Sequence, residues 1–451
     1  MTDTILCVDI GTSSLKAALL PDNLRAGEIF VSRQYFSRAA VVENRVAEEW
    51  LPCLKAAVAE LTAKNPDYAV EAVCVSGNGP TVVTDDGTTL LYNQLFVNGS
   101  RGQAGNLSAQ KKLALKNTKS LFIPRFCGFK LNFPFSWNDS AHIFGAPEFL
   151  IHELTGETVS ILPEERFLPA YWNEDELKKC GFSEDDCKKF PGFVKAGNFV
   201  GKVSASAAIA TGLLEGTLVF AGAPDFVVAL IGTGTVLPGR LCDRAGTSEG
   251  LNLCTSKPVF AEGLRTLPSV VSGLWNVSYL INSSQSLRGH RETSLCENPS
   301  HGENPSVNSV ASVRNVSYLL KLTTDYTDAT DEKSNLCKSV TSVVYSDELS
   351  RGENPSVNSV ASVRKFDELS RGINLLREAA LSYGEYFPDF MTITGGQALN
   401  ESLVAQKEAA CGIKIKKMPC ADAELLGDLI LARVGLGDYD DITEAVFAIL
   451  G

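Results

Sequence analysis

The sequence predicts an α/β fold with two domains. Short apolar runs typical of buried strands alternate with segments of helical periodicity in both halves of the chain. The chain has 451 residues, whereas a single hydrophobic core rarely grows beyond about 250 to 300 residues. We therefore expect a first domain at residues 1–240 and a second at residues 241–451.

Strand and helix signals alternate through the first half. The run ILCVDIGTSSLKAALL predicts a strand, a tight turn and a second strand, and a further strand is expected at EIFVSRQYF. EEWLPCLKAAVAELTA has apolar residues at helical spacing, and AVEAVCVSGNG predicts a buried strand that ends in a glycine loop. Two more helices are expected at PEFLIHELTGE and SASAAIATG, closed by Gly156 and Gly212, before a buried strand at TLVFAGA.

The end of the chain repeats this alternation. A helix is predicted around INLLREAALSYGEYF, followed by a strand at FMTIT and a Gly-Gly turn. A helix at SLVAQKEAA, a strand at IKIKK and a helix from Ala421 to Val434 complete the pattern. Both halves are thus expected to be α/β.

An anomalous segment at about residues 287–370 separates these parts. GENPSVNSVASVR occurs identically at Gly302–Arg314 and at Gly352–Arg364, with shorter copies at unequal offsets. A solenoid needs a regular repeat, so this architecture is excluded. The Ser- and Asn-rich composition is typical of a mobile insertion, and verbatim copies are also typical of a recent duplication or of an unreliable stretch of sequence. We assign no chemistry to this segment.

Composition excludes several classes of protein. The net charge of -12 argues against nucleic-acid binding, which needs clustered Lys and Arg. The first residues, MTDTILCVDI, lack the pattern of a signal peptide, and the longest apolar stretch is interrupted by Pro224 and Asp225, so we expect a cytoplasmic protein without a membrane span. The 12 cysteines form no CxxC pair and the 4 histidines lack zinc-binding spacing, so no structural metal is expected.

The first candidate site is the turn after the first strand. Asp9 ends an apolar run, Gly11, Thr12 and Ser13 form a turn whose amides can converge on phosphate oxygens, and Lys16 lies on the return strand. Asp9 could hold magnesium through water, since Mg²⁺ keeps several waters and takes one or two carboxylates. An ordinary hairpin turn is the alternative.

A single acid follows a second apolar strand. In FAGAPDFVVALIGTG, small residues deliver Asp225 to the start of an apparent helix. A carboxylate directed in this way is a candidate catalytic group. Capping of the helix explains the same residue locally, because Asp is a preferred N-cap.

Two further glycine turns are candidates for nucleotide binding. Arg244–Gly250 repeats the Gly-Thr-Ser turn and could grip a polyphosphate from the opposite side. Thr394–Asn400 follows a strand and opens a helix, where bare backbone lets an adenine or ribose lie close. Plain turns explain both motifs equally well when each is taken alone.

Taken together and in order, the motifs resemble the FGGY family of carbohydrate kinases. They are DIGTSSLK, VAEEW, SGNGPTVV, the strand before Asp225, RAGTSEG and ITGGQALN. The resemblance covers about Thr4 to Ser286 and Ile373 to the end. The family shares a superfamily with actin, the heat-shock chaperone ATPases and hexokinase, so the resemblance implies two ribonuclease-H-like domains with an active-site cleft between them.

The resemblance also implies roles for individual residues. Asp225 would be the general base, and Asp9 and Asp225 would hold Mg²⁺, partly through water. ATP would be bound by two phosphate loops and an adenosine site, with Lys16 beside the first loop. The residues concerned are Gly11, Thr12 and Ser13, then Gly246, Thr247 and Ser248, then Gly395, Gly396 and Asn400.

The substrate motifs depart from the family pattern. VNGSR replaces Trp-x-Asp-x-Arg and NGP replaces Gln-Met-His, which leaves Asn78 and Arg101 as candidate substrate contacts. We expect a sugar or polyol substrate, a pentulose type being favoured, and leave a homodimer open. The alternatives are a regulatory protein that binds sugar or nucleotide without catalysis, and an actin-like ATPase.

Overall fold

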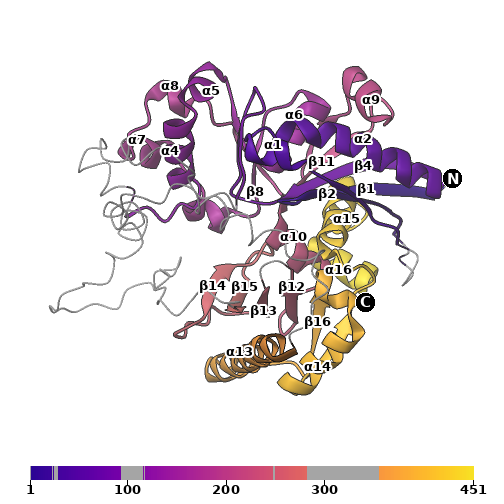
Figure 1. The fold of residues 1–451 in the computed structure, drawn as a ribbon, viewed down its shortest axis with the longest axis vertical. Coiled ribbons are helices and arrows are strands. Elements are labelled where there is room, and N and C mark those ends of the chain that lie inside the picture. The colour runs from indigo at the N-terminus through magenta and orange to yellow at the C-terminus, as the bar shows by residue number, and fades with distance from the viewer. Residues whose placement is uncertain are drawn as a thin grey trace.

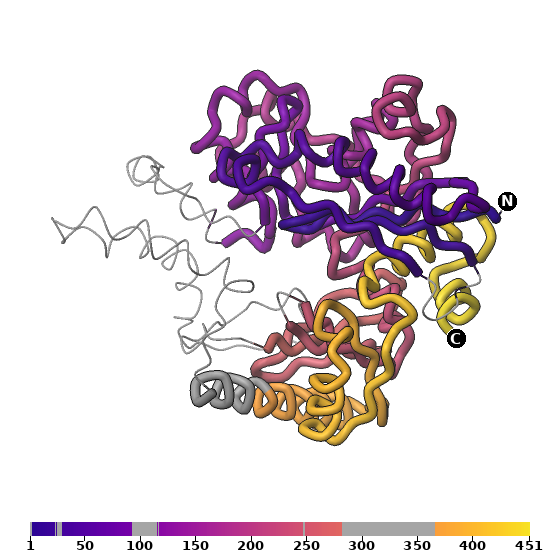
Figure 2. Tube along the Cα trace, turned by 45° about the vertical axis from the view of Figure 1, so that its right-hand side comes forward, coloured from indigo at the N-terminus to yellow at the C-terminus, as the bar shows by residue number. Residues whose placement is uncertain are grey.

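The chain folds into two lobes (Figures 1 and 2). The computed structural model describes residues 2–22, 24, 29–92, 115, 117–246, 249–281 and 355–451, and of residues 355–365 it describes the backbone alone. One lobe contains the N-terminal strands and the other contains the sheet from the second half of the chain (Figure 1).

The first lobe is built on a six-stranded sheet of order β10-β11-β4-β1-β2-β3. β1, β4 and β11 are parallel, whereas β2, β3 and β10 each pair antiparallel with their neighbours. The strands are β1 (Thr2–Ile10), β2 (Ser14–Leu20), β3 (Ser32–Tyr35), β4 (Tyr68–Gly77), β10 (Phe199–Lys202) and β11 (Leu218–Pro224). Because Gly77 is in register with both Ile10 and Pro224, the three parallel strands end at one edge.

Both faces of this sheet are buried, which explains the continuous apolar runs of β1 and β4. Leu6 and Val8 face a core that includes α2 (Ala47–Lys64) and α6 (Ala146–Thr155). The alternate residues Ile5 and Cys7 face α10 (Asp225–Gly232) and α15 (Ala423–Leu436). α15 therefore packs on the first sheet although it comes from the end of the chain.

The second lobe contains a six-stranded sheet of order β14-β15-β13-β12-β16-β17. β12, β13 and β15 pair antiparallel in succession, and β16 and β17 continue parallel to β12. The first sheet has the same pattern in β1, β2, β3, β4 and β11, so the two halves share a topology. The strands are β12 (Leu241–Ala245), β13 (Glu249–Thr255), β14 (Arg265–Pro268), β15 (Trp275–Ile281), β16 (Phe390–Thr394) and β17 (Lys414–Lys417).

Helices α13 (Pro355–Ser382) and α14 (Glu401–Cys411) lie beside this sheet (Figure 1). Their packing follows from the apolar face of α13, where Leu369, Ile373 and Leu376 are buried against β13 and β15. The expected division near residue 240 falls between α10 and β12 and stays a prediction.

The lobes meet where α10 and α15 cross. Gly232 and Gly427 lie at this crossing, and a Cβ atom on either would overlap the backbone of the other helix. Glycine at both positions lets the two helices approach closely.

Smaller elements complete the first lobe and the C-terminus. A group of buried aromatic side chains joins α4 (Ile123–Asn132), α5 (Pro134–Asp139) and the 3₁₀ helix η2 (Glu165–Ala170). The remaining elements are α1 (Arg38–Val42), β5 (Val82–Thr84), β6 (Thr89–Leu90), β7 (Ile143–Phe144), β8 (Ser160–Leu162), α7 (Glu174–Lys179), α8 (Glu184–Cys187), β9 (Phe193–Lys195), α9 (Ala205–Thr211), η3 (Gly396–Leu399) and α16 (Ile442–Leu450).

The expected α/β elements are confirmed, with two corrections. The strand expected at EIFVSRQYF is limited to Ser32–Tyr35. The anomalous segment at about 287–370, whose composition is typical of a mobile insertion, ends in a helix, because α13 begins at Pro355 and includes most of the second GENPSVNSVASVR copy. The first copy lies outside the described residues. Within the described part of the chain, no helix is long and apolar enough to cross a membrane.

Candidate functional site

The candidate site begins at the edge where β1, β4 and β11 end. Asp9 lies one residue before the end of β1 and is 2% exposed. Its Oδ2 atom lies 2.8 Å from the Nζ atom of Lys16, its register partner on β2. Its Oδ1 atom is buried and accepts no hydrogen bond from the described residues. One carboxylate oxygen is thus available to a ligand.

The turn after Asp9 is tight. The Gly11 amide donates to the Ser14 carbonyl at 2.9 Å, and the Phe36 amide donates to the Ser13 carbonyl at 3.0 Å. A Cβ atom on Gly11 would lie 3.0 Å from the Ser14 carbonyl oxygen, which favours glycine there. Thr12 is half-buried and Ser13 is exposed, so this turn presents hydroxyl groups at its surface.

Lys16 connects Asp9 to two acids that the sequence analysis did not identify. Its Nζ atom lies 3.2 Å from Asp422 and 3.9 Å from Glu424, both at the start of α15. Burial alone would lower the pKa of Lys16, but the carboxylates of Asp9, Glu424 and Asp422 raise it well above its ordinary value. Arg33 adds a second contact to Asp422, at 3.0 Å. The Lys16 charge is therefore already neutralised by protein carboxylates.

Asp225 is the first residue of α10, directly after β11. The N-cap of this helix is Pro224, and no side chain caps it, so the capping role is not observed. The Phe226 amide donates to Asp225 Oδ1 at 2.6 Å. Burial, and next the negative charge of Asp9, raise the pKa of Asp225 to about 6, although Arg244, the Phe226 amide and Lys16 act in the opposite direction. Asp225 is thus a stronger base than an ordinary aspartate and still ionised at neutral pH.

The two glycine turns of the second lobe lie against each other. Gly246 follows β12, and Gly395 follows the neighbouring β16 with φ of 88°. A Cβ atom on Gly395 would lie 2.7 Å from the Ala245 carbonyl oxygen and 2.9 Å from the Gly246 nitrogen. Thr247 and Ser248 lie outside the described residues.

The rest of the second turn leads into α14. Gly396 is exposed, and Asn400 caps α14 by accepting a hydrogen bond from the Leu403 amide at 3.0 Å. Capping uses the Asn400 Oδ1 atom and leaves its amide nitrogen for other contacts.

A cluster of buried charged side chains lies beside both turns and connects them. Lys407 on α14 is 1% exposed, and its Nζ atom lies 2.5 Å from Asp243 and 2.7 Å from Glu249. The Gln397 side chain donates to the Glu249 carboxylate at 3.0 Å. Asp243 and Glu249 flank the turn after β12 and Gln397 belongs to the turn after β16, so the cluster ties the two turns together.

Of the two candidate substrate contacts, Asn78 lies at the strand edge and Arg101 lies outside the described residues. Asn78 Nδ2 donates to the Ile10 carbonyl at 2.8 Å, and its Oδ1 atom accepts from Thr81. Both polar atoms of Asn78 thus make contacts within the protein. Its role toward a substrate stays a prediction.

Asp9 and the strand edge are compatible with bound magnesium. In the described ranges, no group of three or more His, Cys, Asp or Glu side chains is arranged to hold a metal ion. Mg²⁺ bound beside a nucleotide does not need such a group, since phosphates and water supply most of its ligands. The available Oδ1 atom of Asp9 fits this mode of binding.

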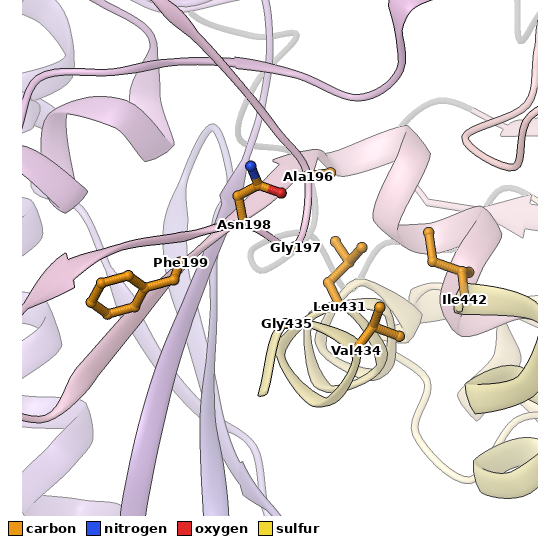
Figure 3. A pocket seen from close by; sticks show the side chains of 8 residues that line it. All are labelled: Ala196, Gly197, Asn198, Phe199, Leu431, Val434, Gly435 and Ile442. Atoms are coloured by element: carbon orange, nitrogen blue, oxygen red, sulfur yellow. The ribbon is translucent and has the colours of Figure 1, made fainter. Parts of the chain in front are cut away.

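Figure 3 shows a surface pocket of about 490 Å³. The pocket is formed by the loop before β10, the first residue of β10, α15 and the start of α16. None of the site residues expected from the sequence lines this pocket. The lining residues are Ala196, Gly197, Asn198, Phe199, Leu431, Val434, Gly435 and Ile442.

Comparison with known proteins gives one family match and one curated relative. A model of the N-terminal domain of the FGGY family of carbohydrate kinases matches residues 4–232. Xylulose kinase of Bacillus subtilis is 24% identical over 265 residues, which cover 54% of this chain and 52% of the relative. The match thus spans about half the length of this relative.

Solved structures match over almost the whole chain. Xylulose kinase from Rhodospirillum rubrum has a TM-score of 0.64 at 15% identity, and gluconate kinase from Lactobacillus acidophilus has 0.63 at 14%. Plasmodium falciparum glycerol kinase with ADP has 0.62 at 13%. Each match covers 99% of this chain and 92% of the other. The chain therefore has the two-domain fold of the actin and hexokinase type.

Proposed function

The chain belongs to the FGGY family of carbohydrate kinases, and we propose that it transfers the terminal phosphoryl group of ATP to a hydroxyl group of a sugar or polyol. The observation that carries the proposal is the Asp225 carboxylate, which lies at the strand edge within electrostatic reach of Asp9 and has a pKa raised to about 6. A positioned carboxylate of this basicity suits proton removal from an alcohol.

In the proposed reaction, the substrate hydroxyl oxygen forms a bond to the terminal phosphorus of ATP. The bond between that phosphorus and the bridging oxygen breaks, ADP leaves, and the hydroxyl proton passes to the Asp225 carboxylate. Such a transfer depends mainly on alignment and on neutralisation of charge at the phosphates. Late proton transfer in a loose transition state lets an aspartate act as the base.

The nucleotide would lie between the glycine turns of the two lobes. Gly11, Thr12 and Ser13 would bind phosphate oxygens from the first lobe, next to Lys16. From the second lobe, a phosphate loop of Gly246, Thr247 and Ser248 and an adenosine site of Gly395, Gly396 and Asn400 would complete the contact. The contact between Gly395 and Gly246 supports this proposal, because it makes the two turns of the second lobe one continuous surface.

Magnesium would be held by Asp9 and Asp225, partly through water. The ion would neutralise negative charge on the phosphates when bound. The buried Oδ1 atom of Asp9, which lacks a described hydrogen-bond donor, supports this assignment.

For the substrate we favour a pentulose, contacted by Asn78 and Arg101. The curated relative is named xylulose kinase, which supports this choice. Gluconate and glycerol are the competing candidates, because kinases named for them have the same fold.

The test measures ADP release with Mg-ATP against a panel of pentuloses, hexuloses, aldoses, gluconate and polyols, with a control that lacks sugar. Stimulation by one panel member is expected, with turnover of the Asp225→Asn variant lower by roughly 10² to 10⁴ and its ATP affinity nearly unchanged. High ADP release in the absence of sugar would indicate an ATPase and contradict the proposed kinase activity. ATP binding without any transfer would favour a regulatory protein.

A further inference from the structure

We infer that Arg244 binds the phosphoryl group that is being transferred, from the side of the second lobe. This inference rests on the proposed function, because it assigns Arg244 a role at the same site. The sequence analysis placed Arg244 at the start of a glycine turn without giving its side chain a role.

The position of Arg244 on β12 directs it toward the first lobe. Side chains alternate along a strand, so Arg244 shares a face with Cys242, while Asp243 points the other way to Lys407. Cys242 is buried in the core formed with α10, α15 and the first sheet. Arg244 therefore extends from the sheet face that meets the first lobe.

Arg244 also lies between the two glycine turns of its own lobe. Its register partners are Gly250 on β13 and Thr394 on β16. Gly246 follows it by two residues, and Gly395 follows Thr394 directly. A phosphate held by both turns would thus lie next to the base of this side chain.

No described residue forms a hydrogen bond or ion pair with the Arg244 guanidinium, and its Nε atom is buried without a hydrogen-bond partner. Two buried or half-buried lysines of the site and its support are paired with carboxylates: Lys16 with Asp9, and Lys407 with Glu249. Arg244 is half-buried, and a partly desolvated charge without a partner is unfavourable until an opposite charge arrives. A guanidinium in this state favours an anion with several oxygens, since its fork of donors matches phosphate.

Arg244 is within electrostatic reach of the proposed base. Its charge is the first of the three influences that lower the pKa of Asp225. The oxygen that gives its proton to Asp225 is the one that bonds to phosphorus, so the transferring group passes close to both residues. Negative charge spreads over the three equatorial oxygens during transfer, and a positioned guanidinium stabilises it.

The test compares Arg244→Gln and Arg244→Lys with the matched control Arg240→Gln. Arg240 lies just before the opposite end of β12 and stacks on Phe390 at 5.7 Å. For Arg244→Gln we expect kcat lower by about 10² to 10³, an unchanged KM for the sugar and an unchanged unfolding temperature. Arg244→Lys keeps the positive charge but lacks the forked donors of a guanidinium, so its kcat should lie between the values of Arg244→Gln and the wild type. Arg240→Gln should match the wild type.

Calorimetric binding of ATP, ADP and AMP separates this inference from the proposed function. Arg244→Gln should weaken ATP binding more than ADP or AMP binding, a result that supports the inference even if no sugar is phosphorylated. If Arg244→Gln has the kcat and the ATP affinity of the wild type, the inference is overturned, while the proposed kinase function is unaffected. Equal loss of all three nucleotides together with a lower unfolding temperature would also overturn it, since that result indicates a structural role.

Discussion

The ammonium group of Lys407 lies 2.7 Å from the carboxylate of Glu249 in the interior of the second lobe. Asp243 contacts the same ammonium group at 2.5 Å, and all three side chains are nearly inaccessible to solvent. Two buried carboxylates therefore share contact with one buried ammonium group, and such a buried cluster is more sensitive to loss of the charge than a surface ion pair.

Replacement of Lys407 by Met should destabilise the protein by about 3 to 5 kcal/mol, because it removes a buried positive charge that contacts two buried carboxylates. Urea unfolding measures this loss. The control is Lys417→Met. Lys417 lies 3.0 Å from the exposed carboxylate of Glu401, and loss of this surface ion pair should cost at most about 1 kcal/mol. Adding Glu249→Gln to Lys407→Met should recover part of the stability, and equal losses in Lys407→Met and Lys417→Met would contradict this account.

The pH dependence of kcat/KM should show an acid limb centred near pH 6, because the pKa of Asp225 is raised to about 6. Below this pH the carboxylate is protonated and cannot accept the substrate proton, so activity should fall about tenfold for each pH unit. Above it the ionised base is fully present and the limb should level off. The residual activity of Asp225→Asn should lack this limb. A wild-type profile that is flat from pH 5 to pH 8 would remove Asp225 as the base.

Alanine at Gly427 should strain the crossing of α10 and α15, since the new Cβ atom would meet the Val228 backbone. Overpacking of this kind costs about 1 to 3 kcal/mol, which thermal unfolding would detect. Gly192→Ala is the matched control, because no atom lies within 4 Å of its added Cβ. If both variants unfold at the same temperature, close contact is not the reason for glycine at the crossing.

The sequence alone predicted most of the α/β elements, because their signals are local. Continuous apolar runs mark β1 and β4, and glycines at positive φ end α6 and α9 where expected. The candidate turns also followed from local pattern, and Asp225 stood out as a lone acid after an apolar strand.

The residues that the sequence analysis missed depend on contacts between distant segments. Lys407 lies in SLVAQKEAA, where a lysine is typical of an exposed helix face. Its burial is explained by Asp243 and Glu249, which lie on the distant β12–β13 hairpin. Asp422 likewise precedes an ordinary helix, and its relation to Lys16 arises because α15 returns to the first sheet. Arg244 gave no signal beyond its place before a glycine turn.

Arg166 should hold the two lobes in contact. From η2 its guanidinium donates to the carbonyls of Ser269 and Val271 at 3.1 Å and of Leu274 at 3.0 Å, all in the turn between β14 and β15. The same guanidinium lies 5.3 Å from the Trp275 ring. Hydrogen bonds from a charged donor contribute about 1.5 to 3 kcal/mol each, so this set should limit opening of the turn.

Arg166→Gln should therefore accelerate amide hydrogen exchange in residues 269–274 at least several-fold, because the carbonyls lose their charged donor and the turn opens more often. Exchange followed by mass spectrometry measures this effect. Lys195→Gln is the control, since Lys195 on β9 forms an exposed ion pair with Glu165 of the same 3₁₀ helix. Protection of residues 269–274 that is the same in both variants would show that the apolar contacts of Val270 and Val271, and not Arg166, hold this turn in place.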